Sequence, residues 1–91
     1  MKFEASSSFD RAFSKLPQDR QERVEAAISA LVDFFEKQQK TPGLGLKHLR
    51  KSFWEIRAGL KDRVLFTFGG ATVQFVMVGN HDEIRRALRV L

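Results

Sequence analysis

The sequence predicts an α+β fold in which a short N-terminal strand and a two-helix hairpin precede a mainly antiparallel sheet, built as a three-strand meander, and a C-terminal helix. Three observations predict it. Apolar residues recur at three- and four-residue spacing in the first half of the chain, whereas they alternate with other residues in the second half. A Gly69-Gly70 pair also separates two alternating runs. With 91 residues and no linker-like stretch, we expect one domain over 1–91.

The first elements follow from capping residues and periodicity. Residues 2–7 are expected to form the short strand, after which Ser7 or Ser8 caps a short helix over 9–16. Pro17 suits the first position of a second helix, because proline at that position loses no hydrogen bond that the helix would make.

The second helix is expected to run from Gln18 to about Gln39 and to end at Thr41-Pro42-Gly43. Spacing of three and four residues places its apolar side chains in one stripe, which must be buried. The stripe contains Val24, Ala27, Ile28, Leu31, Phe34 and Phe35.

The second half of the chain predicts the meander. Strands are expected over 53–58, 63–68 and 72–78, with a turn at 59–62 and the glycine pair as a two-residue hairpin loop. Beyond Gly79-Asn80, residues 82–90 are expected to form a helix that begins with acids, which suit the positive end of its dipole.

Alternation then assigns the two faces of this sheet. With the loop at the glycine pair, Phe68 faces Ala71, and Val64 faces Phe75. The face toward the helices is apolar and holds Val64, Phe66, Phe68, Val73, Phe75 and Met77, together with Trp54 and Ile56 of the first strand. The opposite face is expected to be open, and it holds Glu55, Arg57, Arg63, Leu65, Thr67, Thr72, Gln74, Val76 and Val78.

The segment 44–66 holds six lysines and arginines against two acids. Within it, Arg57 and Arg63 share the predicted open face, where two guanidinium groups fit the oxygens of a phosphate. The alternative is that Arg57 pairs with Glu55 or Asp62 on a solvated surface, since surface ion pairs are common and contribute little.

Further basic residues extend this candidate anion surface. As a functional set they would follow a nucleic-acid backbone, whereas the alternative is an ordinary solvated loop before the meander. The RNA-binding candidates are Lys47, His48, Arg50, Lys51, Lys61, Arg85 and Arg86.

Two further residues are candidates for proton transfer. His81 follows the last strand on the side of Arg63 and suits a proton donor or acceptor, or it is only a neighbour of the helix cap. Glu55 suits a general base or a counter-ion, and the arginines favour the second role because they stabilise its charged form. Two histidines and no cysteine predict neither a metal site nor a cofactor.

Charge and composition bound the partners. A net charge of +5 and a pI near 10.1 favour nucleic acid or an acidic protein. The absence of cysteine fits the reducing cytoplasm, and we expect neither a signal peptide nor a membrane segment.

The order of elements and three motifs resemble the RelE/ParE superfamily of bacterial type II toxins, along nearly the whole chain. The motifs are Phe53–Arg57 (FWEIR), Asp62–Phe66 (DRVLF) and Val78–Arg86 (VGNHDEIRR). The resemblance to RelE-like members implies the microbial ribonuclease fold and a ribosome-dependent mRNA endonuclease that inhibits translation. In that chemistry the ribose 2′-OH attacks the adjacent phosphate without a metal. It also implies a cognate antitoxin, with the ribosome and mRNA as further partners.

The resemblance also implies roles for individual residues. Arg63 matches the strand arginine at the scissile phosphate, Arg57 a basic residue of the preceding strand, and His81 a late basic or histidine residue. Lys47 and Lys51 match a basic approach segment. Two departures stand out, since the chain has no tyrosine near its C-terminus and carries Glu55 where some relatives have lysine. The alternatives are a ParE-like inhibitor of DNA gyrase and a catalytically weakened nucleic-acid-binding relative.

Overall fold

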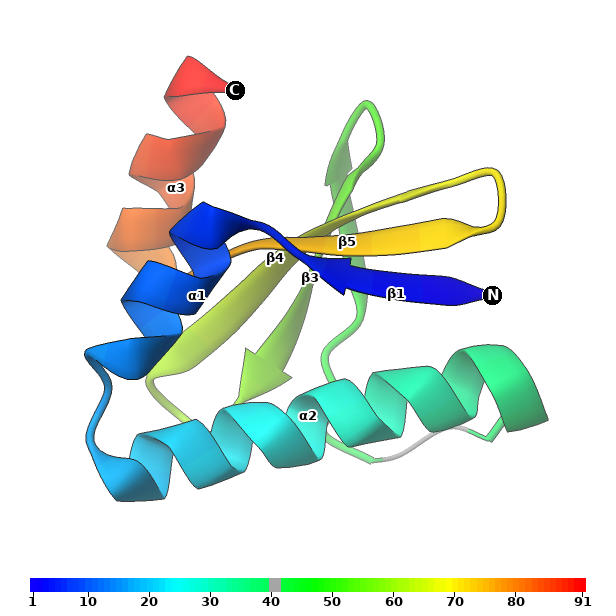
Figure 1. The fold of residues 1–91 in the computed structure, drawn as a ribbon, viewed down its shortest axis with the longest axis horizontal. Helices are drawn as coiled ribbons and strands as arrows, with labels where there is room; N and C mark the ends of the chain where they lie inside the picture. Colours follow the sequence, from blue (N-terminus) through cyan, green and yellow to red (C-terminus); the bar gives the residue numbers. More distant parts are fainter. Residues whose placement is uncertain (40–41) are drawn as a thin grey trace.

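The computed structural model describes residues 1–39 and 42–91, which form a five-stranded sheet and three helices (Figure 1). The strands lie in the order β1-β5-β4-β3-β2, with β1 parallel to β5 and the other neighbours antiparallel. The predicted α+β class is therefore confirmed. The elements are β1 (Lys2–Ala5), α1 (Ser7–Ser14), α2 (Gln18–Lys37), β2 (Lys47–Arg50), β3 (Phe53–Ala58), β4 (Asp62–Gly69), β5 (Thr72–Gly79) and α3 (His81–Val90).

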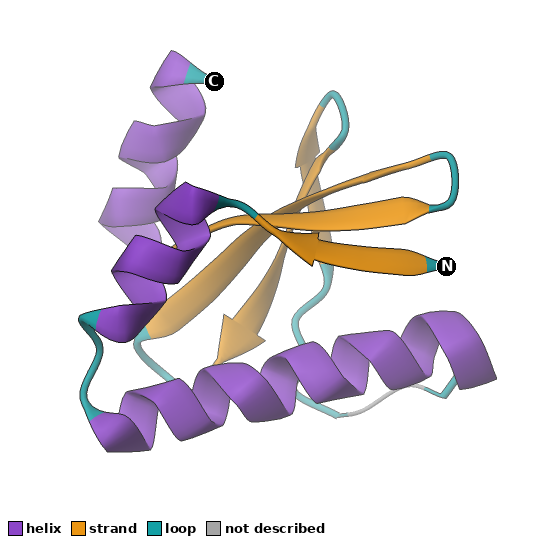
Figure 2. Ribbon diagram, in the orientation of Figure 1, coloured by secondary structure: helices purple, strands orange, loops and turns teal. Residues whose placement is uncertain are grey.

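The main core lies between the sheet and the pair α1 and α2 (Figure 2). Val24 and Leu31 of the predicted stripe are fully buried, and they meet Val64 and Phe66 of β4. Phe34, which was predicted in the same stripe, lies outside this cluster. The predicted alternation of β4 thus holds for this core, because every second residue of a strand points to the same face.

The β4–β5 hairpin differs from the predicted pairing by two residues. Gly69 pairs with Thr72, so the loop is Gly70-Ala71, and Phe68 faces Val73 instead of Ala71. Gly70 has a φ of +59°, which glycine adopts without strain. Because a shift of two residues preserves the faces of a strand, the predicted core positions of β4 are kept.

A bulge then reverses two of the predicted positions of β5. The pairing shifts between Leu65 and Phe66 of β4, which leaves Val76 as the extra residue. Val78 is consequently paired with Val64 in the core, and Met77 is paired with Leu65 on the opposite face. The prediction was wrong for both residues, since it assigned Met77 to the core and Val78 to the open face.

The opposite face of the sheet is partly covered by α3, although we expected it to be open. α3 packs on β4 and β5 (Figure 1), and Leu65 is fully buried although its neighbours Val64 and Phe66 point to the other side. Ile84 of α3 is 2% exposed and lies outside the main core cluster, as does Leu65. Their burial marks a small second core where α3 packs on the sheet.

Truncation of Ile84 tests this second core. We expect Ile84→Ala to lower the free energy of unfolding by about 2–5 kcal/mol, because the lost packing leaves a cavity under the helix. Urea denaturation measures the change. Val90→Ala is the matched control, since Val90 is on the same helix but 85% exposed, and it should change stability by less than about 0.5 kcal/mol. Equal effects of the two variants would contradict the packing of α3 on β4 and β5.

Several predicted boundaries also move. The first strand ends at Ala5, and Ser6 caps α1 by accepting a hydrogen bond from the Phe9 N–H. Pro17 occupies the N-cap position of α2, which ends at Lys37, before the predicted Gln39. Thr41 of the predicted helix stop lies outside the described residues.

The basic segment before the meander contains a strand that was not predicted. Lys47–Arg50 pairs with β3 as β2, at the edge of the sheet. Its four residues carry three basic side chains, a composition by which edge strands avoid pairing with other proteins. Among the described residues, no helix is both long and apolar enough to span a membrane.

Candidate nucleic-acid interface

The register of β3 and β4 brings the predicted arginines together. Arg57 and Arg63 are directly opposite each other, so their side chains start from the same face of the sheet. Glu55 lies on that face too, and its Oε2 is 3.8 Å from Nε of Arg63. The side chains of Glu55 and Arg63 are only 12% and 16% exposed, which makes this loose pair partly desolvated. Glu55 is therefore within ion-pair distance of Arg63.

Arg63 opens into a hollow of about 510 Å³ between the β3–β4 turn and the start of α3. We call it the Arg63 hollow. His81 lines the same hollow, as the sequence predicted from its place after β5. Leu60, at the tip of the turn, also lines it and is 99% exposed. The polar lining comprises Arg20, Lys61, Arg63, Asn80, His81 and Asp82.

A second hollow of about 260 Å³ lies between β2 and α3, and we call it the β2–α3 hollow. His81 lines it as well, so this residue stands at the junction of the two hollows. Together they form a path around the first turn of α3 that is lined mainly by cations. The polar lining of the β2–α3 hollow comprises Lys47, His48, Arg50, Glu55, His81 and Arg85.

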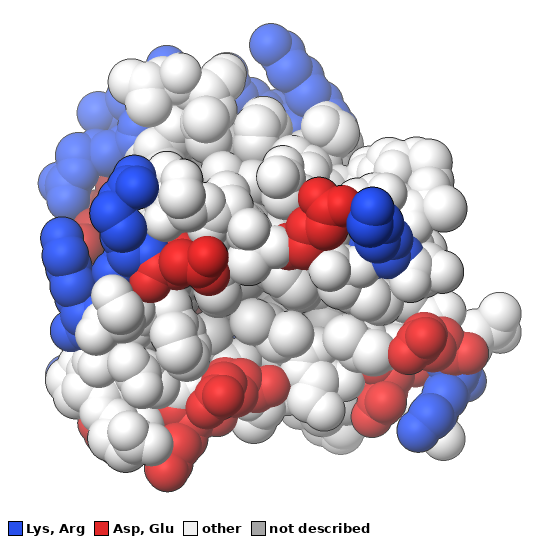
Figure 3. All heavy atoms as spheres, in the orientation of Figure 1, with Lys and Arg blue, Asp and Glu red and all other residues white. Residues whose placement is uncertain are grey.

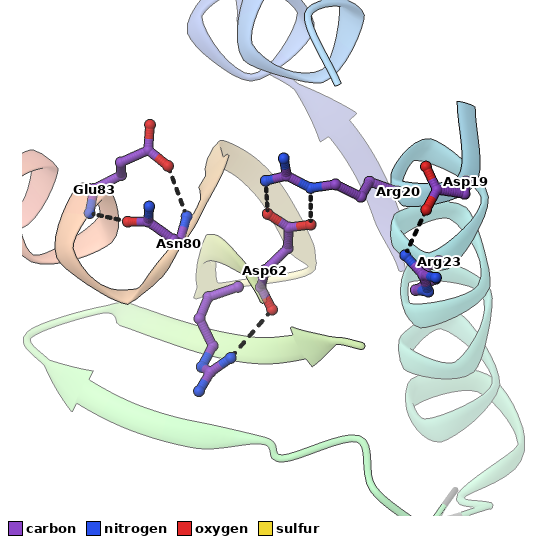
Figure 4. Close-up of polar contacts among 7 residues, drawn as sticks. Asp19, Arg20, Arg23, Asp62, Asn80 and Glu83 are labelled. Carbon is purple, nitrogen blue, oxygen red and sulfur yellow. Dashed lines mark hydrogen bonds and ion pairs between the residues drawn. The ribbon is translucent and has the colours of Figure 1, made fainter. Parts of the chain in front are cut away.

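A capping box positions His81. The Asn80 side chain accepts a hydrogen bond from the Glu83 N–H at 2.9 Å, and the Glu83 carboxylate accepts one from the Asn80 N–H at 2.8 Å (Figure 4). His81 is therefore the first residue of α3, whereas the predicted helix began at Asp82. Such a box fixes the chain entry into a helix, and here it sets the exposed His81 at the rim of both hollows.

Arg20 and Asp62 form a partly buried ion pair beside the Arg63 hollow (Figure 4). Nε and Nη2 of Arg20 donate to the two carboxylate oxygens of Asp62 at 2.9 and 2.6 Å. Asp62 is 1% exposed, and its hydrogen bonds with Arg20 raise the pKa of that guanidinium. The Asp62 carbonyl also accepts a hydrogen bond from Nη1 of Arg63 at 3.3 Å. The pair thus connects α2 to the candidate site.

This connection differs from the sequence-based alternative. Asp62 and Glu55 were both considered as partners of Arg57, but their partners are Arg20 and Arg63. Arg20 was not predicted as a site residue at all. The bidentate contact joins residues 42 positions apart, and neither the spacing nor the helical pattern of α2 distinguishes Arg20 from its exposed neighbours.

Arg57 itself lies beside the hollows and lines neither. Its aliphatic stem covers Gly45, where a Cβ would come within 2.7 Å of the Arg57 Cγ. Gly45 also has a φ of +64°, so two constraints favour glycine there. Lys51 and Arg86 are exposed and line neither hollow.

Two of the predicted RNA-binding residues make contacts within the protein. The His48 ring lies 4.7 Å from the Trp54 ring, and its Nε2 donates to the Lys51 carbonyl at 2.7 Å. Arg50 donates to the Leu88 carbonyl near the C-terminus of α3, which ties β2 to that helix. Both residues therefore shape the β2–α3 hollow as well as lining it.

Charge is unevenly distributed over the surface. Lys and Arg gather along the side where α1 and α3 lie, whereas Asp and Glu are prominent over α2 (Figure 3). In residues 1–39 and 42–91, no three His, Cys, Asp or Glu side chains are grouped so that they could hold a metal ion. The charged groups that line the two hollows are guanidinium, ammonium, imidazole and carboxylate groups.

The fold is shared with bacterial and archaeal toxins. A copper-bound mutant toxin from Helicobacter pylori aligns with a TM-score of 0.74 and 17% identity over 92% of this chain and 98% of that one. YafQ from E. coli gives 0.73 and 13% over 91% and 96%. RelE, in its complex with RelB from Methanococcus jannaschii, gives 0.69 and 17% over 96% and 98%. The chain has the RelE-like toxin fold.

The match to these toxins comes from the comparison of structures. No family model matches the sequence, and no curated protein matches it significantly. At identities of 13–17%, the three alignments establish architecture over nearly the whole chain. The predicted RelE-like architecture is thus confirmed.

Proposed function

We propose that the chain is the toxin of a type II toxin–antitoxin module and cleaves mRNA on the ribosome, in the cytoplasm. One observation carries the proposal. Arg63, Lys61 and His81, predicted from the sequence as phosphate-binding and proton-transfer groups, line a single hollow on a RelE-like fold. A cluster of cations beside a histidine is suited to a reaction that builds negative charge at phosphorus.

In the proposed mechanism, the scissile phosphate binds in the Arg63 hollow. The 2′-OH attacks phosphorus and the bond from phosphorus to the 5′-oxygen breaks, which leaves a cyclic phosphate and a free 5′-OH. Arg63 and Lys61 neutralise the charge that grows on the non-bridging oxygens during this step. His81 transfers a proton to or from the ribose oxygens, since an imidazole carries out both steps near neutral pH. Lys47 and Arg85 hold the flanking backbone in the β2–α3 hollow, with Arg50, Lys51 and Arg86 as further phosphate contacts.

The proposed partner is an antitoxin. RelE and YafQ are found with antitoxins in structures that share this fold. A net charge of +5 favours a partner with an acidic segment, because complementary charge speeds association and suppresses wrong partners.

Induction of the chain from a tightly controlled promoter tests the proposal. We expect growth arrest, together with new mRNA 5′ ends at codon positions that primer extension maps only while translation proceeds. DNA damage with intact mRNA would instead indicate gyrase inhibition. Arrest without in-frame cleavage would overturn the nuclease assignment.

The two histidines provide a matched comparison. We expect His81→Gln to reduce single-turnover cleavage about 10²–10⁴-fold, the usual contribution of a general acid or base. His48→Gln should cost less than about tenfold, because the ring of His48 already donates to a backbone carbonyl. Cleavage of programmed ribosomes measures both. If the two variants lose activity equally, His81 does not transfer the proton.

A further inference from the structure

The turn between β3 and β4 carries an apolar side chain that the proposed reaction does not use. Leu60 is 99% exposed, and within residues 1–39 and 42–91 no other apolar side chain lines the Arg63 hollow. The other large apolar side chains that are exposed in these ranges are Met1, Val90 and Leu91, close to the chain ends. A single exposed leucine is ordinary on a protein surface, so the surroundings of Leu60 decide whether it has a role.

The turn is held at both ends by α2. The stem of Arg23 covers Gly59, where a Cβ would come within 2.7 Å of the Arg23 Cδ. At the other end, Arg20 holds Asp62 in the bidentate pair (Figure 4). The loop between the two strands has only three residues. Leu60 therefore projects from a fixed support, as a side chain that positions a ligand must.

The residues around the hollow offer two kinds of contact. Lys61 and Arg63 are cations that suit phosphate oxygens, whereas Leu60 is purely apolar. A nucleotide presents the same two chemistries, because its phosphate is anionic and the faces of its base are flat and apolar. Leucine is among the side chains that pack against bases in nucleic-acid complexes. When a phosphate lies on the two cations, a neighbouring base is thus the part of the RNA that matches the leucine.

We propose that Leu60 packs on the face of a base beside the scissile phosphate and favours a purine at that position. Since the phosphate is placed on Arg63 and Lys61 by the proposed function, this role rests on that function. A purine has two fused rings and a pyrimidine has one, so a purine gives the leucine a larger apolar face to cover. Leu60 is then a specificity residue, and it takes no part in proton transfer.

Cleavage of programmed ribosomes tests this preference. The mRNAs differ only in one nucleotide on either side of the cleaved bond, adenosine against uridine. At one of these positions, we expect the wild-type chain at subsaturating concentration to cut the adenosine mRNA about three- to tenfold faster, the ratio that about 30–50 Å² of additional apolar contact supplies. In Leu60→Ser the ratio should fall below about twofold, because serine offers almost no apolar surface. Leu60→Met should retain the preference, since methionine is apolar and adapts to its partner.

Val90→Ser is the matched control for the loss of an exposed apolar side chain. Val90 is 85% exposed and lines neither the Arg63 hollow nor the β2–α3 hollow, so the ratio should stay at the wild-type value. Equal slowing of both mRNAs in Leu60→Ser would mean that the leucine supports the turn instead of contacting a base, and it would overturn the proposal. A wild-type ratio near one at both positions would overturn it too.

A binding measurement without ribosomes locates the contact. In Leu60→Met with methyl-labelled methionine, the added methyl group reports on the turn, and Met1 and Met77, which do not line the Arg63 hollow, are internal references. The probes are trinucleotides of 2′-O-methyladenosine and of 2′-O-methyluridine, whose blocked 2′-oxygen cannot attack phosphorus. We expect the saturating adenosine probe to move the added methyl resonance upfield, because the ring current of a base shields a methyl group packed on its face. The uridine probe should move it less.

The two measurements together distinguish the role of Leu60 from the nuclease assignment. An unshifted methyl resonance in a chain that cleaves mRNA would overturn the role of Leu60 alone. A shifted resonance in a chain that cleaves no mRNA would overturn the nuclease assignment and leave Leu60 as a contact for bases. Failure of both measurements would overturn both proposals. An equal shift of the reference methyl groups would mean non-specific binding and would also overturn the role of Leu60.

Discussion

Arg63→Ala is expected to abolish growth inhibition while leaving the protein folded. Its guanidinium is the most enclosed cation of the Arg63 hollow that is not already in a bidentate pair. Removal of a group that stabilises transition-state charge typically costs about 10²–10³-fold in rate. Single-turnover cleavage on programmed ribosomes measures the loss, and circular dichroism with urea denaturation verifies the fold.

Arg57→Ala is the sharpest control for this prediction, because Arg57 starts directly opposite Arg63 in the sheet. The aliphatic stem of Arg57 packs on Gly45, and the residue lines neither hollow. We therefore expect Arg57→Ala to reduce the cleavage rate by less than about tenfold. Sequence alone treats the two arginines as an equivalent clamp. Equal losses of activity in the two variants would show that both arginines bind the phosphate. A fully toxic Arg63→Ala would show that the phosphate binds elsewhere.

The core of the fold is predictable because its apolar residues repeat with the period of the strand or helix that carries them. Val64, Phe66 and Phe68 recur at every second position, so alternation places all three on the face of β4 that carries the main core. Even a hairpin misplaced by two residues leaves these side chains inside. The stripe of α2 is equally robust, since Val24 and Leu31 recur at helical spacing.

The alternation of apolar residues does not predict the register of a strand where several registers would bury equally apolar residues. Val76, Met77 and Val78 follow one another, so an inserted residue leaves no trace in the hydrophobicity and the bulge is invisible. β2 is missed for a different reason. It is short and charged, and an edge strand of this kind has the composition of a loop.

The candidate site is predictable where it depends on local order and hidden where it depends on distant contacts. His81 follows β5 directly, so its position near Arg63 can be inferred from the meander. The covering of the sheet by α3 depends on the helix direction after Asn80, which the sequence pattern leaves open. Arg20 reaches the site only through tertiary packing of α2 against the start of β4.

The Arg20–Asp62 pair should account for the largest loss of stability among polar substitutions. Arg20→Ala leaves the carboxylate of Asp62, 1% exposed, without its partner, and such a loss costs about 3–5 kcal/mol. Urea denaturation measures the change in the free energy of unfolding. Arg23→Ala is the matched control on the same helix. Arg23 pairs with Asp19 where both side chains are more than half exposed, so its loss should cost less than about 1 kcal/mol.

The double variant Arg20→Ala/Asp62→Ala distinguishes two causes of the loss of stability, the unpaired carboxylate of Asp62 and the lost contacts of Arg20. If the cost of Arg20→Ala comes from the unpaired carboxylate, removal of Asp62 as well should recover part of it, giving a coupling of about 1–3 kcal/mol. Additive losses would mean that the two residues stabilise the protein separately.

A coupled pair also predicts slower RNA cleavage in Arg20→Lys. Lysine lacks the bidentate geometry that holds the Asp62 carboxylate, and the Asp62 carbonyl in turn contacts Arg63. Slower cleavage in Arg20→Lys would mean that the pair positions Arg63. Stability and activity would then fall together because both depend on how Asp62 is held.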